Sequence, residues 1–296
     1  MRKRYRAFQM FLTPPIVIFS DLDGTLLDPA TGSADAAIDA IGMIAHARIP
    51  LVFCSSKTRA EIQLLQQELD VHHPFIVENG GALYIPEGYF DFDVPWGRPL
   101  ASGFIVVQYG RRYGEVVDKL GRAARRARVR VVGFNEMSVD EVAQECALPL
   151  LSARLAKLRE YSEPFRVADT AAASRRRLEH AMTTEGLTWA AGAPFDVAGL
   201  HKDQGLPVRM LISLYRRVMG QVQTVGLGDA PDDVPLLQRV DRPVIVRRQT
   251  DVQMTDMVTK VPRAALTRTS GPAAWAGEVI RIVTESMAVP ESRTST

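Results

Sequence analysis

Acidic residues follow two short apolar stretches that lie far apart in the chain. Asp21 and Asp23 come directly after the apolar run 16–19. Three further carboxylates follow a second apolar run that ends near residue 227; they are Asp229, Asp232 and Asp233. Carboxylates held at the end of a strand can bind a divalent cation, and one of them can act as a nucleophile. A solvated acidic turn is the alternative, and it would be preferred for the second stretch taken alone.

Two other polar positions could bind an anion beside these carboxylates. Ser55 and Ser56 follow the apolar run 51–54 and precede a predicted helix. The N-terminus of a helix attracts anions because its first N–H groups have no partner within the helix. Lys202 leads into another predicted helix, and its ammonium group could bind the same anion. Taken alone, the serines could begin a turn and Lys202 could be a surface lysine, but beside the carboxylates we favour an anion site.

The surrounding residues predict alternating strands and helices. Unbroken apolar runs at 16–19, 51–54 and 75–77 are typical of strands that are buried on both faces of a parallel sheet. Thr58 and Glu61 form a capping box, which predicts the start of a helix. The carboxyl ends of parallel strands meet at one edge of a sheet, where such folds bind ligands. The predicted fold class is therefore α/β, with a Rossmann-like parallel sheet as its core.

This regular alternation stops near Pro86 and resumes after residue 200. The stretch between these points begins with prolines, glycines and aromatic residues and continues with mixed strand and helix patterns, which indicate an α+β insert. We predict that residues 1–87 and 200–296 form a catalytic core and that residues 88–199 form an inserted cap domain. Turn signals inside the insert are too few to predict the order of its strands.

Composition favours an ordinary globular protein of the cytoplasm. Lys and Arg number 36 and Asp and Glu number 34, so a net charge of +2 gives no indication of nucleic acid or membrane as a partner. Cys54 and Cys146 lack a metal-binding spacing and fit a reducing compartment. The apolar piece Phe8–Leu12 is too short for a secretory signal, and the sequence has no run of 18 apolar residues. The oligomeric state is not predicted.

Taken together, the polar motifs resemble those of the haloacid dehalogenase-like superfamily of phosphatases. The resemblance rests on four motifs in order, which are Asp21-Leu-Asp-Gly-Thr25, Ser55, Lys202, and Gly228-Asp229 with Asp233. The insert between the second and third motifs resembles the large α+β cap, called type C2B, of one branch of that superfamily. The resemblance covers most of the two predicted core segments and is patchier in the cap.

The resemblance implies a phosphatase that depends on Mg²⁺ and forms an aspartyl-phosphate. Asp21 would be the nucleophile, Asp23 the general acid and base, and Lys202 a catalytic cation. The implied metal ligands, one of them a backbone carbonyl, come from Asp21, Asp23, Asp229 and Asp233. The expected substrate-binding residues are Thr25, Ser55, Ser56, Asn79, Arg159 and Glu163. For Arg159 and Glu163 we favour a surface ion pair over substrate contact, and a turn before two glycines explains Asn79 adequately.

Several stretches further resemble the mannosyl-3-phosphoglycerate phosphatases within that superfamily. They are Phe53–Arg59, Pro74–Gly81, Arg159–Tyr161 and Val225–Asp229. This resemblance implies a phosphorylated sugar or glycosyl glycerate as the small-molecule substrate.

Three departures from that family leave the substrate open. Gly192-Ala-Pro-Phe195 stands where the family usually has Gly-Gly-Arg-Phe, so an arginine that could hold a carboxylate or phosphate is missing. Asp203 and Asp232 stand where glycine and asparagine are usual. Phosphatases of glucosyl-3-phosphoglycerate or of another sugar phosphate are therefore alternatives. A phosphate-binding module without turnover is a third, against which the intact Asp21 and Asp23 argue.

Overall fold

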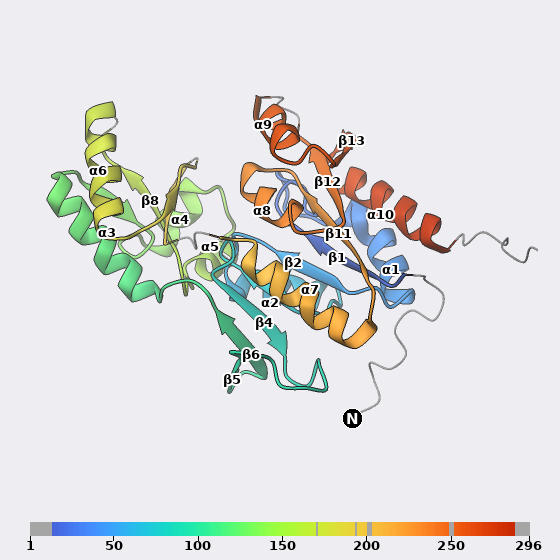
Figure 1. The fold of residues 1–296 in the computed structure, drawn as a ribbon. Coiled ribbons are helices and arrows are strands. Elements are labelled where there is room, and N and C mark those ends of the chain that lie inside the picture. Colours follow the sequence, from blue (N-terminus) through green and yellow to red (C-terminus); the bar gives the residue numbers. More distant parts are fainter. Residues whose placement is uncertain (1–13, 170, 193, 200–202, 249–251, 288–296) are drawn as a thin grey trace, which may run out of the picture.

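The computed structural model describes residues 14–169, 171–192, 194–199, 203–248 and 252–287. The chain forms two lobes, a core built on a large sheet and a smaller cap (Figure 1). The chain leaves the core after strand β6 (Phe104–Gln108) and rejoins it at helix α7 (Leu206–Met219). The cap is therefore an insertion within the core, as predicted.

The core sheet consists of nine strands. They are β1 (Ile16–Ser20), β2 (Leu51–Cys54), β3 (Phe75–Val77), β4 (Ala82–Pro86), β5 (Arg98–Leu100), β6, β11 (Gln223–Gly228), β12 (Arg242–Arg247) and β13 (Ala265–Ser270). Their order is β13-β12-β11-β1-β2-β3-β4-β6-β5. The six strands from β13 to β3 pair in parallel, whereas β4, β6 and β5 are antiparallel to their neighbours. The predicted α/β class with a largely parallel core sheet is confirmed.

Strand β1 lies in the middle of the parallel part, where the strand order reverses. The chain passes from β1 to β2 on one side, and β11 later pairs with β1 on the other side, with Ile18 opposite Val225. Every residue of β1 is completely buried, as expected for an unbroken apolar run. At such a switch point, the ends of two neighbouring strands border a crevice where ligands bind.

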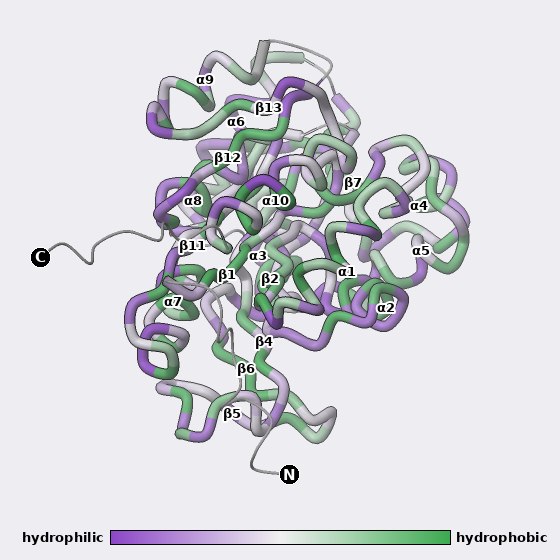
Figure 2. The backbone as a smooth tube through the Cα atoms, turned by 90° about the vertical axis from the view of Figure 1, so that its right-hand side faces the viewer, coloured by the Kyte–Doolittle hydropathy of each residue, from purple (hydrophilic) through white to green (hydrophobic). Residues whose placement is uncertain are grey.

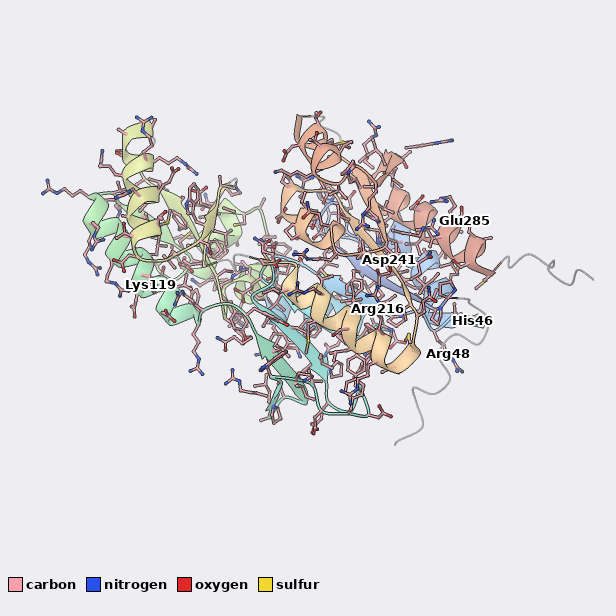
Figure 3. The ribbon with its side chains drawn as sticks, viewed as in Figure 1. His46, Arg48, Lys119, Arg216, Asp241 and Glu285 are labelled. Carbon is pink, nitrogen blue, oxygen red and sulfur yellow. The ribbon has the colours of Figure 1, made fainter. Side chains whose placement is uncertain are left out.

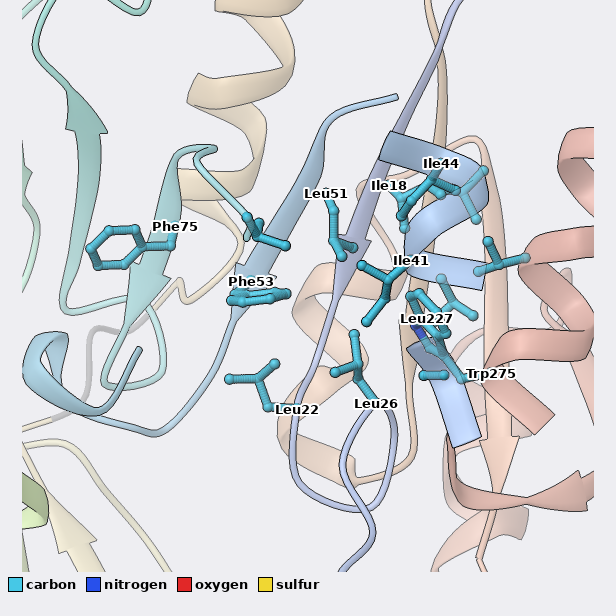
Figure 4. Packing of buried hydrophobic residues seen from close by; sticks show 14 of the residues in the cluster. Ile18, Leu22, Leu26, Ile41, Ile44, Leu51, Phe53, Phe75, Leu227 and Trp275 are labelled. Carbon is cyan, nitrogen blue, oxygen red and sulfur yellow. The ribbon is translucent and has the colours of Figure 1, made fainter. Parts of the chain in front are cut away.

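Helices cover both faces of the core sheet. They are α1 (Ile38–His46), α2 (Arg59–Glu68), α7, α8 (Val234–Leu237), α9 (Val252–Lys260) and α10 (Gly271–Met287), with short 3₁₀ turns η1 (Asp35–Ala37) and η2 (Pro231–Asp233). On one face, Ile18 packs in a cluster with Ile44 of α1 and Trp275 of α10 (Figure 4). On the other face, Val17 shares a cluster with residues of α7 and α8. The side chains of adjacent β1 residues therefore pack on opposite faces of the sheet, as the two-residue period of a strand requires.

The cap combines a four-stranded antiparallel sheet with four helices. Its strands are β7 (Val131–Gly133), β8 (Glu163–Val167), β9 (Trp189–Ala190) and β10 (Asp196–Ala198), in the order β7-β8-β10-β9. Its helices are α3 (Tyr113–Ala127), α4 (Val139–Glu145), α5 (Leu150–Ala156) and α6 (Ala172–Thr184). Leu120 of α3 and Leu178 of α6 pack with Phe165 of β8. Helices α4 and α5 lie toward the core helix α2 (Figure 2), where the Thr58 hydroxyl donates to the Leu155 carbonyl at 3.0 Å.

The structure corrects the expected start of the cap at residue 88. Strands β5 and β6 belong to the core sheet, where Ile105 of β6 pairs with Ile85 of β4. The loop before β5 also packs on the core, since Phe90 contacts Tyr215 of α7 edge to face. The change of composition near Pro86 marks a core loop, and we propose that the cap begins near residue 110 instead.

None of the helices in the described part of the chain is both long enough and apolar enough to cross a membrane. Figure 3 shows charged side chains over both lobes, among them Lys119 of α3 and Glu285 of α10. Glu285 pairs with Arg242 of β12 at 3.0 Å, which ties the last helix to the core sheet. Such exposed pairs contribute little to stability, typically less than about 1 kcal/mol.

Candidate active site

Three carboxylates meet at the carboxyl ends of the two central strands. Asp21 follows β1, and Asp229 and Asp233 lie just after β11, each with an oxygen within 4.8 Å of the others. The parallel register holds the first two together, because the Asp21 N–H donates to the Leu227 carbonyl at 2.9 Å. The expected convergence of the two acidic motifs is therefore present. Carboxylate oxygens grouped in this way suit a hard divalent cation.

Asp233 also holds the end of β11 in place. One oxygen of its carboxylate accepts hydrogen bonds at 2.9 Å from the backbone N–H groups of Asp229 and Ala230. A Cβ atom at Gly228 would lie 2.5 Å from the Cβ of Asp233, so only glycine fits at that position. Gly228, Asp229 and Asp233 are thus required together for a structural reason, the close packing and hydrogen bonds of Asp233, as well as for the chemistry of the carboxylates.

Thr25 and Gly24 support Asp229 from the first motif. Thr25 is completely buried and donates its hydroxyl to one Asp229 oxygen at 3.0 Å. We therefore propose that Thr25 orients a metal ligand, in place of the substrate contact expected from the sequence. Gly24 has φ +85°, and a Cβ atom there would lie 2.4 Å from the other Asp229 oxygen. The motif therefore needs glycine for both conformation and space.

Gly24→Ala is expected to destabilise the fold by about 1–3 kcal/mol and to weaken Mg²⁺ binding, because the new methyl group must displace Asp229. Urea denaturation and calorimetric titration with Mg²⁺ measure the two effects. Gly32→Ala is a matched control, since Gly32 also has positive φ, +71°, but no atom lies within 4 Å of the place that its new methyl group would take. Equal losses of stability at both sites with unchanged Mg²⁺ affinity would contradict the assignment.

Burial makes the three carboxylates costly to ionise without a cation. It raises the pKa of Asp21 well above its usual range, and the nearby Asp233 and Asp229 raise it further. Burial and the Asp232 and Asp229 charges likewise raise the pKa of Asp233, while burial raises that of Asp229 against the opposing effect of Arg248. A bound cation would reverse this effect by stabilising the charged forms.

Arg248 is a cation at this site that was not predicted from the sequence. It follows β12, and its guanidinium Nε contacts the second Asp229 oxygen. Nothing in the local sequence indicates this contact, because it depends on β12 lying beside β11. A metal ion that binds Asp229 through this oxygen must compete with Arg248.

Arg248→Gln is expected to tighten Mg²⁺ binding about tenfold, because it removes this competitor, and to lower the melting temperature of the metal-free protein. Calorimetric titration and thermal unfolding in EDTA give the two values. Arg242→Gln, which breaks only the outer pair with Glu285, serves as the control. An unchanged Mg²⁺ affinity in the Arg248 variant would show that the two cations do not compete.

Asp23 is not one of the three grouped carboxylates and instead contacts the second motif. Its carboxylate lies 2.9 Å from the Lys57 ammonium group and is half exposed. If Asp23 is a metal ligand, its backbone carbonyl is then the group available. Lys57 is a second cation with no role predicted from the sequence, although it directly follows the two serines of that motif.

The residues of the second motif form a tight loop at the end of β2. Ser55 is buried, and its hydroxyl accepts a hydrogen bond from the Lys57 N–H at 3.2 Å. Ser56 is exposed. The capping box at Thr58 and Glu61 is present as predicted and begins α2 directly after the loop. The loop therefore lies next to a helix N-terminus, and through Lys57 it is linked to Asp23 of the first motif.

Behind the first motif, the last helix supports the backbone of Asp21. The Trp275 indole N–H donates to the Ser20 hydroxyl at 2.9 Å, and that hydroxyl donates to the Asp21 carbonyl at 2.6 Å. Trp275 and Ser20 are completely buried. No local sequence pattern could have paired residues so far apart in the chain.

The remaining expected site residues lie elsewhere or outside the described chain. Lys202 lies outside the described residues. Asn79 is partly buried in a turn at φ +52°, and its N–H donates to the Ser55 carbonyl at 3.0 Å. Glu163 is completely buried in the cap and accepts hydrogen bonds from Tyr113 and Asn135; burial raises its pKa.

Arg159 does not form the exposed ion pair that was favoured from the sequence. Only 7% of its side chain is exposed, and it pairs with Glu78 of the core at 3.3 Å. Since Arg159 and Glu163 both use their polar groups on other residues, we propose structural roles for them instead of the substrate contact first considered.

The three departures have separate local explanations. Asp203 accepts a hydrogen bond from the Gly205 N–H and pairs with Arg239 at 3.0 Å, just before α7 begins. Asp232 is exposed and lies outside the group of three carboxylates. In the cap, Pro194 is exposed, while Phe195 is buried against Phe134. The position of the usual arginine thus carries no charge in this chain.

Comparisons with known proteins agree with this geometry. Residues 18–90 match the family described as haloacid dehalogenase-like hydrolase. The chain is 34% identical over 268 residues to the glucosyl-3-phosphoglycerate/mannosyl-3-phosphoglycerate phosphatase of Methanococcoides burtonii, covering 90% of this chain and 97% of that protein. It is 31% identical over 230 residues to the mannosyl-3-phosphoglycerate phosphatase of Pyrococcus horikoshii, covering 78% and 90%.

A solved structure shows the same fold over nearly the whole chain. The haloacid dehalogenase-like hydrolase from Bacteroides thetaiotaomicron superposes with a TM-score of 0.62 at 16% identity, covering 90% of this chain and 99% of that one. At that identity, the match concerns the fold of core and cap together.

Proposed function

Because the chain belongs to the haloacid dehalogenase-like hydrolases, we propose that it is a Mg²⁺-dependent phosphatase that releases phosphate from a glycosyl-3-phosphoglycerate, most closely mannosyl-3-phosphoglycerate. One observation carries the proposal. Asp21, Asp229 and Asp233 converge at the switch point of the sheet, with Asp23 and the Ser55 loop beside them. This arrangement offers a nucleophile, an acid and base, and groups for phosphate at one edge.

In the first step, an Asp21 oxygen attacks phosphorus and the bond from phosphorus to the ester oxygen breaks. Asp23 gives its proton to the departing alkoxide, so a neutral alcohol leaves and an aspartyl-phosphate remains. Asp23 is suited to this role because it adjoins Asp21 but projects outside the carboxylate group. Because the Asp23 carboxylate is not among the three proposed metal ligands, it can give and accept a proton in this mechanism.

In the second step, Asp23 accepts a proton from water while the water oxygen attacks phosphorus. The bond to Asp21 breaks, inorganic phosphate leaves, and both carboxylates return to their starting states. The Ser55 loop and Lys202 would hold the phosphate oxygens in both steps. Mg²⁺, held by Asp21, Asp229 and Asp233, would neutralise charge on the phosphate.

The substrate is proposed from the relatives together with the cap. The two relatives named above act, by their names, on mannosyl- or glucosyl-3-phosphoglycerate. Because Pro194 stands where the cap arginine is usual, this chain must hold the glycerate end in another way. The name of the Methanococcoides burtonii relative includes both the glucosyl and the mannosyl substrate, so we expect this chain to accept both.

Measuring phosphate release with Mg²⁺ from a panel of substrates tests this function. The panel contains mannosyl-3-phosphoglycerate, glucosyl-3-phosphoglycerate, several hexose phosphates and p-nitrophenyl phosphate. We expect the highest kcat/KM for the two glycosyl-3-phosphoglycerates. A higher value for a hexose phosphate would identify a different sugar phosphatase, and no release from any member would indicate a phosphate-binding module.

A further inference from the structure

Glu78 is a buried carboxylate of the core that holds a loop of the cap. It follows β3 and is 1% exposed, with φ +49°. Its two oxygens accept hydrogen bonds from three consecutive N–H groups, those of Glu160 at 2.8 Å, Tyr161 at 3.1 Å and Ser162 at 2.8 Å. The Ser162 hydroxyl donates to it at 2.7 Å. A buried charge with this many donors is well satisfied, so the cap loop 160–162 is firmly attached to the core.

This attachment lies beside the two points where the chain crosses between the lobes. A methyl group at Gly110, shortly after β6, would lie 3.1 Å from the Cβ of Tyr161. One at Gly199, shortly after β10, would lie 2.8 Å from the Tyr161 carbonyl oxygen. The core glycine Gly81 is just as close, since a methyl group there would lie 2.7 Å from the Cβ of Tyr161. In addition to the two covalent crossings and the Thr58–Leu155 hydrogen bond, the cap loop thus forms a further non-covalent connection between cap and core.

Side chains of the cap loop reinforce this connection. Tyr161 and Glu160 both hydrogen-bond to the Tyr84 hydroxyl of the core at 2.9 Å. Arg59 of α2 donates to the other Glu160 oxygen at 2.7 Å. The loop therefore contacts β4 and α2 as well as the turn that carries Glu78.

Arg159 joins this connection to the loop at the end of β2. Its Nε lies 3.3 Å from Glu78, its Nη2 donates to the Ser162 hydroxyl at 2.5 Å, and its Nη1 donates to the Ser56 carbonyl at 3.1 Å. Arginine can serve three partners at once because its donors form a rigid planar fork. One side chain of the cap therefore contacts both the core carboxylate and the serine loop.

Each of the three backbone carbonyls of the loop Ser55–Lys57 accepts a hydrogen bond from Arg159, from Glu78 or from the neighbouring Asn79. The Asn79 N–H donates to Ser55 at 3.0 Å, the Glu78 N–H donates to Lys57 at 3.1 Å, and Arg159 donates to Ser56. The carbonyl and N–H of a trans peptide point in opposite directions. Fixing the Ser55 carbonyl toward Asn79 therefore turns the Ser56 N–H to the opposite side, where it is available to an anion.

We propose that Glu78 and Arg159 are positioning residues for the phosphate-binding loop, and that they make its affinity for phosphate depend on the placement of the cap. The inference rests on the proposed function in taking Ser55–Lys57 as the phosphate loop. Arg159 acts here through the backbone of Ser56, without touching the glycosyl group. Direct contact with the substrate is the competing role, and it predicts a different pattern of kinetic changes.

The test uses p-nitrophenyl phosphate and inorganic phosphate, which lack the glycosyl group. We expect Arg159→Gln to raise both the KM for p-nitrophenyl phosphate and the inhibition constant of inorganic phosphate about tenfold, with kcat changed less than about threefold. Arg159→Lys keeps the charge beside Glu78 but loses the fork, so its constants should lie between those of the wild type and Arg159→Gln. Arg166→Gln, which breaks an exposed cap pair with Glu145, should change neither constant.

Two outcomes would overturn the proposal. If Arg159→Gln raises KM only for the glycosyl substrate and leaves phosphate inhibition unchanged, Arg159 contacts the substrate directly. If hydrogen exchange at residues 56–57 and 160–162 is the same in the wild type and in Arg159→Gln, the loop is not held through Arg159. Hydrogen exchange requires no turnover, so it tests the connection even if the proposed substrate is wrong. Glu78→Gln should speed exchange in both segments if it folds, and Arg159→Lys provides the test if it does not.

Discussion

Asp21→Asn is expected to reduce phosphate release by at least about four orders of magnitude on every ester, because the variant has no carboxylate that can form the phosphoenzyme. Asparagine has almost the same size, so the loss cannot be attributed to a cavity. Asp39→Asn is a matched control, since Asp39 is an exposed residue of α1. Substantial Mg²⁺-dependent release by the Asp21 variant would remove this residue from the nucleophile's role.

The same variant should melt at a higher temperature than the wild type in EDTA at neutral pH. Burial and two neighbouring carboxylates raise the pKa of Asp21, so its ionised form destabilises the metal-free fold. An acid whose pKa is raised on folding costs stability as the pH rises above its unfolded value of about 3.9. Removing the charge removes this cost. The thermal measurement therefore also establishes that an inactive variant is folded.

Asp23→Ala is expected to slow release from glycosyl-3-phosphoglycerates by about 10²–10⁴-fold, and release from p-nitrophenyl phosphate much less in the first step. A sugar alkoxide needs a proton as it leaves, whereas nitrophenolate leaves readily without one. Rapid-quench measurement of the first turnover separates this step from hydrolysis of the phosphoenzyme. Equal first-step losses on both substrates would exclude Asp23 as the acid.

Lys57→Met, which removes the cation beside Asp23, provides a comparison for the first-step rate of the Asp23 variant. Lys57 lies 2.9 Å from the Asp23 carboxylate and also 4.0 Å from Glu61. Lys57 holds the Asp23 carboxylate by this contact, but in the proposed first step the proton comes from Asp23 itself. We therefore expect Lys57→Met to slow the first step on glycosyl-3-phosphoglycerates less than Asp23→Ala does.

The core could be predicted from sequence because its signals are local. Residues 16–19 form an unbroken apolar run, as is typical of a strand buried on both faces, and the capping box of Thr58 and Glu61 begins helix α2. The carboxylates of the site follow such strands directly, so a correct prediction of the strands placed them at one edge. The mixture of strands and helices in the cap was also predicted, but not the arrangement of these elements.

What the sequence could not predict depends on contacts between distant segments. Strand β5 is only Arg98–Leu100 and begins with an exposed charge, while β13 is mostly exposed, so neither has the apolar pattern of a buried strand. Arg248 and Trp275 reach the site only because β12 and α10 pack beside β11 and β1. In the sequence, Glu78 is explained by a turn before two glycines. Its function in joining the lobes becomes visible only when residues 160–162 are placed against it.

The position of β1 also has a consequence for synthesis of the protein on the ribosome. One edge of this strand pairs with β11, which begins about 200 residues later in the chain. At ordinary rates of translation, that partner emerges roughly 10–40 s after β1 has been made. During this interval, a nascent chain carries an apolar strand with an open edge and has no site for chemistry. Chaperones that bind such edges should therefore engage the segment around β1, and activity should arise only after Asp229 and Asp233 have emerged.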